Sequence, residues 1–265
     1  MNPRRLKVVA PPVAERGSGK ILEIQGVRKV FAVGGAYRAV LEGIDITVRR
    51  GELICLLGRS GCGKSTLLNI IAGFMAPSAG KVLLSGQPAL RPGPDRCVVF
   101  QEDALFPWLT VAENIAFGLR AKACPRRRVK AEVDRFLDLV GLNEFRDYLP
   151  REISGGMKQR VALARVLVLS PQVLLMDEPF AALDAQTRDE MQHLMLTLWD
   201  RLSQTIMFVT HDVQEAVTLA DRVLFIDKDP GRIRQDIHVR LPRPRQKETP
   251  AFMALCRELL EALRI

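Results

Sequence analysis

The feature that most constrains this fold is a glycine-rich stretch between a short apolar run and a segment of helical spacing. It reads Gly58-Arg59-Ser60-Gly61-Cys62-Gly63-Lys64-Ser65-Thr66 and fits the pattern G-x-x-x-x-G-K-[ST]. Residues 52–57 before it are typical of a buried strand, and residues 66–72 after it have helical spacing that stops at Gly73. A strand, a glycine loop and a helix N-terminus together present backbone N–H groups to an anion. The stretch therefore predicts a phosphate-binding loop rather than a chance glycine-rich turn.

Each residue type in this loop has its own part in holding a nucleotide. Glycine lets the backbone approach a phosphate without a Cβ clash. Lys64 would reach the β- and γ-phosphates, and the Ser65 hydroxyl would complete the shell of a Mg²⁺ ion. The loop residues expected to contact the nucleotide are Gly58, Ser60, Gly61, Cys62, Gly63, Lys64, Ser65 and Thr66. Because Cys62 stands at a helix N-terminus, we also expect its thiol to be acidic and reactive, and to be protected by bound nucleotide.

The bulk composition is typical of a folded chain from a reducing compartment. Of the 265 residues, 48% are hydrophobic and 26% are charged, which indicates a sizeable core. The five cysteines are scattered without a C-x-x-C pair, which argues against disulfides and a zinc site. No apolar run approaches the roughly 18 residues of a membrane-spanning helix, and the N-terminus lacks the apolar region of a secretion signal. We expect a cytoplasmic protein whose membrane part, if it works at a membrane, belongs to a partner.

The net charge of +9 is concentrated in three places. Basic residues gather in the first 20 residues, in the run 126–130, and between Arg240 and Lys247. We interpret such runs as solvated faces first and as contacts for anionic lipid headgroups second. Residues 1–19 are polar and contain proline and glycine, and they predict a disordered basic tail.

Hydrophobic periodicity divides the rest of the chain into a strand-rich start, a helical middle and an alternating end. The predicted strands are 21–30, 39–48, 52–57, 81–84, 97–100, 173–176, 205–209 and 222–226. The predicted helices are 66–72, 112–119, 127–140, 156–169, 185–202, 213–219 and 250–263. A turn at Gly34-Gly35 makes the first two strands an antiparallel pair, and the proline-rich stretch 88–94 is predicted to be loop.

These elements predict an α/β fold with three parts. The alternation of strands and helices after residue 173 indicates a parallel sheet that is covered on both faces and belongs to the phosphate-loop core. An antiparallel β subdomain precedes this core. An α-helical subdomain is inserted into it at about residues 104–169.

Two carboxylates end the apolar strand predicted at 173–176. Ligands of open α/β sheets bind beyond the carboxyl ends of the strands, where the phosphate loop also lies. We expect Asp177 to hold Mg²⁺, directly or through water, and Glu178 to act on the attacking water as a general base or to orient it. The alternative, that both acids only cap the next helix, is weakened by Pro179 and by the apolar strand before them.

A second anion site is predicted at Ser154-Gly155-Gly156, where a serine and two glycines open a helix. An ordinary helix N-cap is the simpler interpretation of these residues taken alone. The chain already cradles its own phosphates with residues 61–66, so a second cradle needs phosphates that are bound by another chain. This favours a head-to-tail dimer with two nucleotides at the interface.

Together these motifs resemble the ATP-binding cassette (ABC) family over about residues 20–245, and residues 153–160 are similar to its signature. The resemblance implies a P-loop NTPase (RecA-like) core with ATP and Mg²⁺ as ligands. It also implies that Gln101 contacts Mg²⁺ or water and couples the site to the transporter. It implies that Asp184 faces the partner subunit and that His211 contacts the γ-phosphate.

The aromatic residue that stacks on adenine in this family is matched by Phe31, with Tyr37 as the less favoured candidate. The family usually has tyrosine at this place, and Phe31 packed in the core is the other interpretation. The signature also departs from the family pattern, because Ile153 replaces leucine and Met157 replaces glutamine. The serine and both glycines remain, so we expect phosphate binding to be retained.

A narrower resemblance is to the nitrate/sulfonate/taurine-type importer ATPases. It depends on residues 93–96, 99–102, 105–109, 154–157 and 241–245. The apolar Leu105, Phe106 and Trp108 are expected either to grip a helix of the membrane subunit or to pack inside the helical subdomain.

The resemblance implies the ATP-binding and ATP-hydrolysing subunit of a bacterial importer for nitrate, sulfonate, taurine or a similar small solute. The implied partners are a second copy of the chain, an integral membrane permease and, indirectly, an external solute-binding protein, without nucleic acid. Such a subunit is peripheral, on the cytoplasmic face of the inner membrane. The predicted divisions are a tail at 1–19, an ABC ATPase domain at 20–245 and a C-terminal helix at 246–265.

Two alternatives remain from the residues alone. One is an exporter or lipid-transport ATPase, which only the family pattern argues against. The other is a soluble ABC ATPase that acts on nucleic acid or ribosomes. Such proteins generally carry a long coiled coil or two cassettes in tandem, whereas one compact insertion separates Lys64 from Ser154 here.

Overall fold

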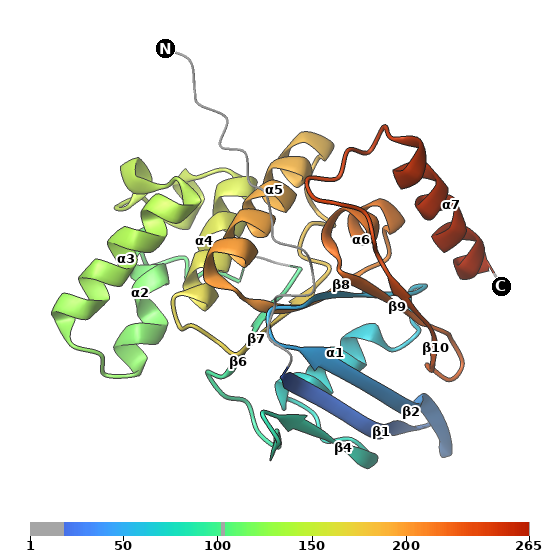
Figure 1. The fold of residues 1–265 in the computed structure, drawn as a ribbon. Helices are drawn as coiled ribbons and strands as arrows, with labels where there is room; N and C mark the ends of the chain where they lie inside the picture. Colours follow the sequence, from blue (N-terminus) through green and yellow to red (C-terminus); the bar gives the residue numbers. More distant parts are fainter. Residues whose placement is uncertain (1–18, 102–103, 265) are drawn as a thin grey trace.

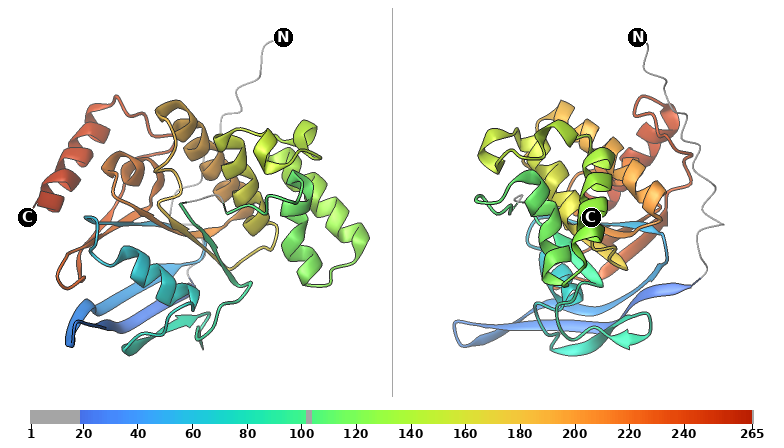
Figure 2. Two further views of the ribbon diagram at one scale, coloured as in Figure 1. Left: turned by 180° about the vertical axis from the view of Figure 1, so that it is seen from behind. Right: turned by 90° about the vertical axis from the view of Figure 1, so that its left-hand side faces the viewer.

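The computed structural model describes residues 19–101 and 104–264. The tail predicted at 1–19 lies outside the described residues, except for Gly19. The described chain contains two sheets, with helices packed on them (Figures 1 and 2).

The larger sheet has six strands in the order β10-β9-β3-β8-β7-β6. Their bounds are β3 (Leu53–Leu57), β6 (Arg96–Val99), β7 (Val173–Asp177), β8 (Thr205–Thr210), β9 (Arg222–Ile226) and β10 (Ile233–His238). Five of them run parallel, and β10 pairs antiparallel with β9 at the edge. Every residue of β3, β8 and β9 is buried, as expected for a parallel sheet covered on both faces. The predicted sheet is confirmed; β10 was not predicted, because an edge strand of mostly polar residues has no apolar run to mark it.

The smaller sheet is antiparallel, in the order β2-β1-β4-β5. Its strands are β1 (Lys20–Val33), β2 (Ala36–Arg49), β4 (Ala79–Leu84) and β5 (Gln87–Pro88). The predicted hairpin is confirmed and its strands extend closer to the turn at Gly34-Gly35 than predicted. Only β5 and the isolated bridge between Gly93 and Arg96 interrupt the loop predicted at 88–94.

The two faces of β3 belong to two different cores. Ile54 and Leu56 pack with the antiparallel sheet and with α1 (Lys64–Ala72). The alternate residues Leu53, Cys55 and Leu57 face the core that the remaining helices build. The side-chain period of 2 in a strand thus places the phosphate loop, which follows β3, at the junction of both cores.

The predicted helical subdomain contains α2 (Val111–Ala121), α3 (Arg126–Val140), the short 3₁₀ helices η2 (Asn143–Phe145) and η3 (Pro150–Glu152), and α4 (Gly155–Leu167). A capping box between Thr110 and Glu113 begins α2, and Gly141, at φ 67°, ends α3. Figure 1 shows α2 and α3 on the side of the molecule away from the C-terminal helix.

The remaining helices are α5 (Ala185–Leu202), α6 (Val213–Leu219) and α7 (Pro250–Arg264). The first two have the predicted bounds, and α7 contacts α6 through a stripe that includes Phe252, Cys256 and Leu259. None of the helices within 19–101 and 104–264 combines the length and apolarity needed to cross a membrane.

The prediction that the basic segment 240–247 is a solvated face is wrong for two of its arginines. The Arg243 guanidinium donates to Asp221 at 2.5 Å and lies 4.5 Å over the Trp199 ring. Arg245 donates to the carbonyls of Val217 at 2.6 Å and Ala220 at 2.7 Å. These carbonyls lie at the end of α6, where a helix leaves its last acceptors unpaired, so the arginine serves as a cap.

Candidate active site

The phosphate loop curls between β3 and α1 at two positions where only glycine fits. Gly61 and Gly63 have φ of 79° and 100°, in the left-handed region that residues with a Cβ avoid. A Cβ on Gly63 would lie 2.7 Å from the Leu41 side chain of β2. The loop is therefore pressed against the antiparallel sheet, with α1 leading away from it.

Lys64 is buried, with 5% exposure, and folds back over the loop. Its Nζ donates to the Gly58 carbonyl at 2.8 Å and to the Arg59 carbonyl at 3.2 Å. Oε1 of Glu178 lies 3.7 Å from this Nζ. A buried ammonium with one loosely held counter-ion is a strong local source of positive charge, as an anion site requires.

Ser65 and Asp177 meet where α1 begins and β7 ends. The Ser65 hydroxyl donates to Oδ1 of Asp177 at 3.2 Å. Burial raises the pKa of Asp177, and the neighbouring Glu178 adds to this, whereas the Ser65 hydrogen bond and Lys64 act in the opposite direction. A desolvated carboxylate beside a hydroxyl is the hard oxygen pair that Mg²⁺ prefers, so these residues fit the predicted ion.

Glu178 has an uncommon backbone conformation. Its φ of 45° lies in the left-handed region, which costs a non-glycine residue about 1–3 kcal/mol. Its N–H donates to the Val209 carbonyl at 3.0 Å, and its carboxylate lies 2.8 Å from Nδ1 of His211. This turn thus brings the carboxylate that follows β7 to the histidine that follows β8.

The hydrogen bond of Gln101 that the structure shows is with another residue than those of this cluster. Gln101 follows β6, and its backbone carbonyl accepts from Nε2 of Gln159 on α4 at 3.3 Å. Among residues 19–101 and 104–264, no hydrogen bond joins the Gln101 side chain to Ser65 or Asp177. Its predicted role at Mg²⁺ stays a prediction.

Phe31 is half-exposed and belongs to neither core cluster. It pairs with Arg38 across the β1–β2 hairpin, and Nζ of Lys29 lies 5.1 Å from its ring centroid. Further along β2, Leu41 contacts the phosphate loop, so the hairpin runs past the site. Tyr37 lies at the tip of the hairpin, where it is largely exposed. Phe31 is therefore available as an aromatic face, and stacking on adenine stays a prediction.

The predicted second anion site begins α4. Ser154 is its N-cap and accepts from the Met157 N–H at 3.3 Å, while a Cβ on Gly155 would meet open space. Asp184 caps α5 in the same way and binds the Thr187 hydroxyl at 2.6 Å, which lowers the pKa of this exposed carboxyl.

The starts of α4 and α5 lie side by side, because a Cβ on Gly156 would lie 2.6 Å from the Thr187 side chain. Ser154, Gly156 and Thr187 line a cavity of about 300 Å³. No hydrogen bond or ion pair in the described ranges links Ser154 or Asp184 to the phosphate loop. The chain therefore carries two separate groups of predicted site residues.

The prediction of an acidic thiol at Cys62 is wrong. The side chain is 2% exposed, and a Cβ on Gly58 would lie 2.8 Å from its Sγ, so the thiol lies beneath the loop. Burial raises the pKa of Cys62, and this outweighs the opposing effect of Lys64 and of the nearby backbone N–H groups. The helix N-terminus was a correct signal, but desolvation of the thiolate is the larger effect.

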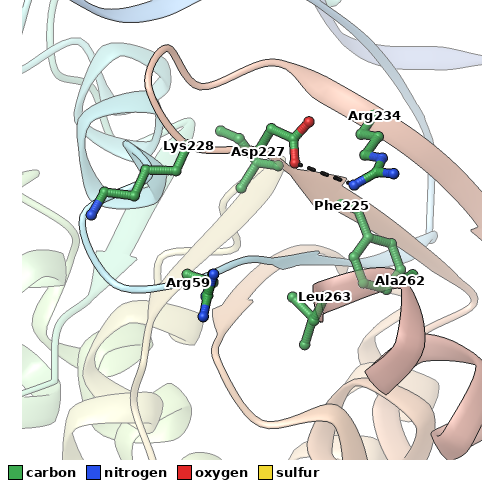
Figure 3. A pocket seen from close by; sticks show the side chains of 8 residues that line it. Arg59, Phe225, Asp227, Lys228, Arg234, Ala262 and Leu263 are labelled. Atoms are coloured by element: carbon green, nitrogen blue, oxygen red, sulfur yellow. Dashed lines mark ion pairs between the residues drawn. The ribbon is translucent and has the colours of Figure 1, made fainter. Parts of the chain in front are cut away.

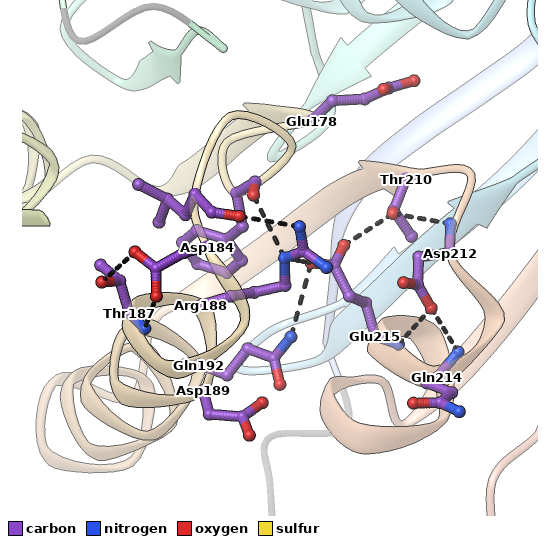
Figure 4. A network of polar contacts seen from close by, with 12 residues as sticks. Glu178, Asp184, Thr187, Arg188, Asp189, Gln192, Thr210, Asp212, Gln214 and Glu215 are labelled. Carbon is purple, nitrogen blue, oxygen red and sulfur yellow. Dashed lines mark hydrogen bonds and ion pairs between the residues drawn. The ribbon is translucent and has the colours of Figure 1, made fainter. Parts of the chain in front are cut away.

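Two features beside the site were not predicted. A cavity of about 170 Å³ lies between Arg59 of the loop, Arg234 of β10 and the end of α7 at Ala262 and Leu263 (Figure 3). A polar network surrounds Glu215 (Figure 4), and Glu215 lines a small cavity together with Glu178 and His211. Neither has a sequence signal, because their members are far apart in the sequence and lie on elements that only the fold brings together.

Comparison with known proteins identifies the class to which this fold and site belong. Residues 41–181 match the model of the ABC transporter family. The chain belongs to this family and is an ATPase whose ATP hydrolysis is coupled to transport.

Within the family, the chain is similar to the nitrate import ATP-binding protein NrtD of Synechocystis sp., with 45% identity over 229 residues, 86% of this chain and 85% of the relative. Among solved structures, it is similar to a dimeric ATP-binding cassette in a post-hydrolysis state bound to ADP and Pi. That match has a TM-score of 0.72 and 29% identity, and it covers 83% of this chain and all of the other.

A cassette from Clostridium perfringens, part of the ABC transporter complex cbiONQ, gives a TM-score of 0.77 and 29% identity, over 92% of this chain and 96% of that one. The predicted fold class is confirmed by these neighbours. So is the predicted resemblance to the nitrate-type importer ATPases, by the Synechocystis relative.

Proposed function

We propose that two copies of this chain close around two Mg·ATP molecules and thereby power a membrane permease that imports nitrate or a similar small solute. The observation that carries this proposal is the separation of two groups of site residues. Lys64, Ser65 and Asp177 belong to one group, and Ser154 and Asp184 belong to another, with no hydrogen bond between the two groups in the described residues. In the dimer, the Ser154 and Asp184 group of one copy would complete the ATP site that the Lys64, Ser65 and Asp177 group of the other copy begins.

The dimer is inferred from a second anion site, at the start of α4, that phosphates on the same chain would not fill. The start of α4 presents Ser154 and Gly155 to solvent, at the positive end of a helix dipole. The γ-phosphate of an ATP on the other copy is an anion of the right kind for this place. Asp184, beside it, would contact the partner near the other phosphate loop. The solved relative bound to ADP and Pi is itself dimeric, which supports this arrangement.

Hydrolysis would use groups that the chain already holds close together. The water oxygen forms a bond to the γ-phosphorus, the bond to the bridging oxygen of ADP breaks, and Glu178 takes the water proton. His211, 2.8 Å from Glu178, holds that carboxylate and faces the γ-phosphate, and Lys64 balances phosphate charge. Mg²⁺, held by Ser65 and Asp177, would neutralise charge on the β- and γ-phosphate oxygens.

An aromatic surface beside Gln101 is the proposed contact with the permease. Trp108 is 72% exposed, and its ring centroid is 5.7 Å from that of Phe106, which lies 4.4 Å from the half-exposed Phe117. Leu105, by contrast, packs into the core of the helical subdomain. Exposed rings in contact with one another are typical of an interaction surface, and an apolar face of a permease helix would cover them.

The rest of the assembly is inferred from the family. Relatives include a nitrate import protein and part of a transporter complex, which supports a permease partner at the cytoplasmic face of the inner membrane. An external binding protein would deliver the solute. The insertion between Lys64 and Ser154 carries two helices of 11 and 15 residues, α2 and α3, which does not favour a coiled-coil ATPase that acts on nucleic acid.

The test is nucleotide-dependent dimerisation of Glu178→Gln, measured by light scattering with Mg·ATP. We expect a monomer that becomes a dimer only with ATP, that no longer hydrolyses it, and that stays monomeric when Ser154→Arg is added. Hydrolysis at the parent rate would show that Glu178 is misassigned. A variant that stays monomeric is measured again with the co-expressed permease, and a monomer there as well would overturn the clamp.

A further inference from the structure

A buried carboxylate that the proposed chemistry does not use lies behind the site. Glu215 of α6 is 6% exposed, and it accepts from the Thr210 hydroxyl at 2.7 Å and from Nε2 of Gln192 at 3.4 Å (Figure 4). Nε of Arg188 on α5 lies 3.8 Å from it. A buried acid stabilises a fold less well than an apolar residue of similar size, so this carboxylate points to another role.

Arg188 connects this acid to the turn that carries Glu178. Its guanidinium donates to the carbonyls of Phe180, at 3.4 Å from Nε, and Leu183, at 2.9 Å from the second terminal nitrogen. These carbonyls lie at the two ends of the segment between Glu178 and Asp184. One side chain therefore holds the turn that joins the proposed hydrolytic residue to the proposed partner contact.

Thr210 connects the same acid to His211. The Thr210 hydroxyl donates to Glu215 and accepts from the Asp212 N–H at 3.0 Å, which fixes the backbone on both sides of His211. Asp212 in turn caps α6 through the N–H of Glu215 at 3.2 Å. Since His211 contacts Glu178, the contacts close into a ring around a cavity of about 50 Å³.

The charges around Glu215 are unbalanced. Burial raises the pKa of Glu215, Asp212 adds to this, and Thr210, Arg188 and Gln192 oppose it. Thr210, Arg188 and Gln192 thus stabilise the charged form of this buried acid as one connected network.

We propose that Arg188 and Glu215 are a positioning pair that holds the turn 178–184 in register with the His211 loop. When Asp184 moves as the dimer closes, this pair then shifts Glu178 and His211 together. Neither residue of the pair belongs to the groups that we propose to bind the nucleotide. The proposal rests on the roles proposed above for Glu178 and His211.

The test compares kcat for ATP hydrolysis with the Kd for Mg·ATP in Arg188→Gln, Glu215→Gln and the double variant of the full-length chain. We expect each single change to lower kcat by about tenfold to a hundredfold, with Kd within about twofold of the parent, because small displacements of catalytic groups have effects of this size. The double variant should lose no more than the worse single one, since the pair acts as a unit. Additive losses, or a Kd that rises as far as kcat falls, would overturn the proposal.

Thr210 offers a second test that preserves the shape of the core. Thr210→Val removes only the hydroxyl and should lower kcat as Glu215→Gln does, whereas Thr210→Ser keeps the hydroxyl and should retain activity. A valine variant that hydrolyses ATP at the parent rate would contradict the proposal. This test remains valid even if the Arg188 and Glu215 variants fail to fold. The control is Asp189→Asn on the same helix, which breaks only the exposed pair with Lys247 at 2.5 Å and should leave kcat unchanged.

Failure of this inference can be told from failure of the proposed function. If Glu178→Gln abolishes hydrolysis while Thr210→Val and Glu215→Gln do not lower kcat, only the positioning pair is refuted. If Glu178→Gln hydrolyses ATP at the parent rate, the assignment of the hydrolytic residue is refuted, and the positioning pair with it.

Discussion

Asp177 is a carboxylate that the fold partly removes from water, although hydration stabilises its charged form. It is the last residue of a buried strand, it adjoins Glu178, and Ser65 is the side chain that donates a hydrogen bond to it. Glu178 next to it adopts a left-handed conformation, and Lys64 is a buried cation. Each of these features destabilises the nucleotide-free chain and suits an ion or a phosphate, as is common at functional sites.

The first prediction at this scale concerns Asp177→Asn. Because the folded-state pKa of Asp177 is raised, the folded chain holds that proton above the ordinary pKa of about 4, and stability falls as pH rises through this window. The asparagine variant lacks this loss, so its melting temperature without nucleotide should exceed that of the parent at pH 7, and by more than at pH 4.5. Hydrolysis with Mg²⁺ should fall by at least about 100-fold. A parent that melts higher at pH 7 would contradict the argument.

A second prediction follows from the burial of Cys62. Alkylation requires an exposed thiolate, and Cys62 has neither the exposure nor the low pKa for it, whereas Cys124 is partly exposed. Iodoacetamide at pH 8 should modify Cys124 at least about tenfold faster than Cys62 in the nucleotide-free protein. Peptide mass spectrometry over time measures both rates in one sample. Faster labelling of Cys62 would show that its thiol is reactive, as the sequence predicted.

At the scale of elements, α6 is a helix of seven residues that needs help from its surroundings. Asp212 caps its start, with bonds to the N–H groups of Gln214 and Glu215. Arg245 caps its end, and α7 packs along it. Since α6 carries Glu215 and begins just after His211, these caps support the site from outside.

Removal of the C-terminal cap should destabilise the protein. Arg245→Met keeps most of the apolar stem but leaves buried carbonyls at the end of α6 without a donor, so we expect a loss of about 1–3 kcal/mol in the free energy of unfolding. Denaturation with urea measures it. The matched control is Arg240→Met, an exposed arginine of the same segment, which should change stability by less than about 0.5 kcal/mol. Equal effects of both changes would show that Arg245 is not a cap.

At the scale of the whole molecule, the chain carries three groups of residues for which we propose separate tasks. The first is the phosphate loop with Asp177 and Glu178, the second is Ser154 with Asp184, and the third is the aromatic surface around Trp108. The first two would meet across a dimer, and the third would contact the permease. In this proposal, ATP binding and contact with the permease use different residues of the chain.

Removal of the aromatic surface should weaken binding to the permease without changing ATP hydrolysis. Trp108→Ala should reduce co-purification with the permease by at least about tenfold, because a central aromatic anchor often contributes 2 kcal/mol or more to an interface. The ATPase rate of the isolated subunit should stay as in the parent. Met253→Ala, which removes an exposed apolar side chain from α7, is the control and should change neither property. A Trp108→Ala variant that retains the permease fully would remove this surface from the interface.

The sequence by itself determined the elements that have a strong local signal. The bounds of α5, α6 and β9 follow from periodicity and caps. The phosphate loop, Asp177-Glu178 and Ser154 follow from motifs whose spacing is local. Short-range patterns determine such features because backbone hydrogen bonds and glycine conformations are local as well.

Only the tertiary structure decided what depends on burial and on contacts between distant segments. It placed Cys62 beneath the loop, so that desolvation outweighs the helix N-terminus. It turned Arg243 and Arg245 from a predicted solvated face into internal donors. It brought Arg188 of α5 next to Glu215 of α6. The charge and polarity of a side chain are visible in the sequence, but its solvation and its partners depend on how the elements pack.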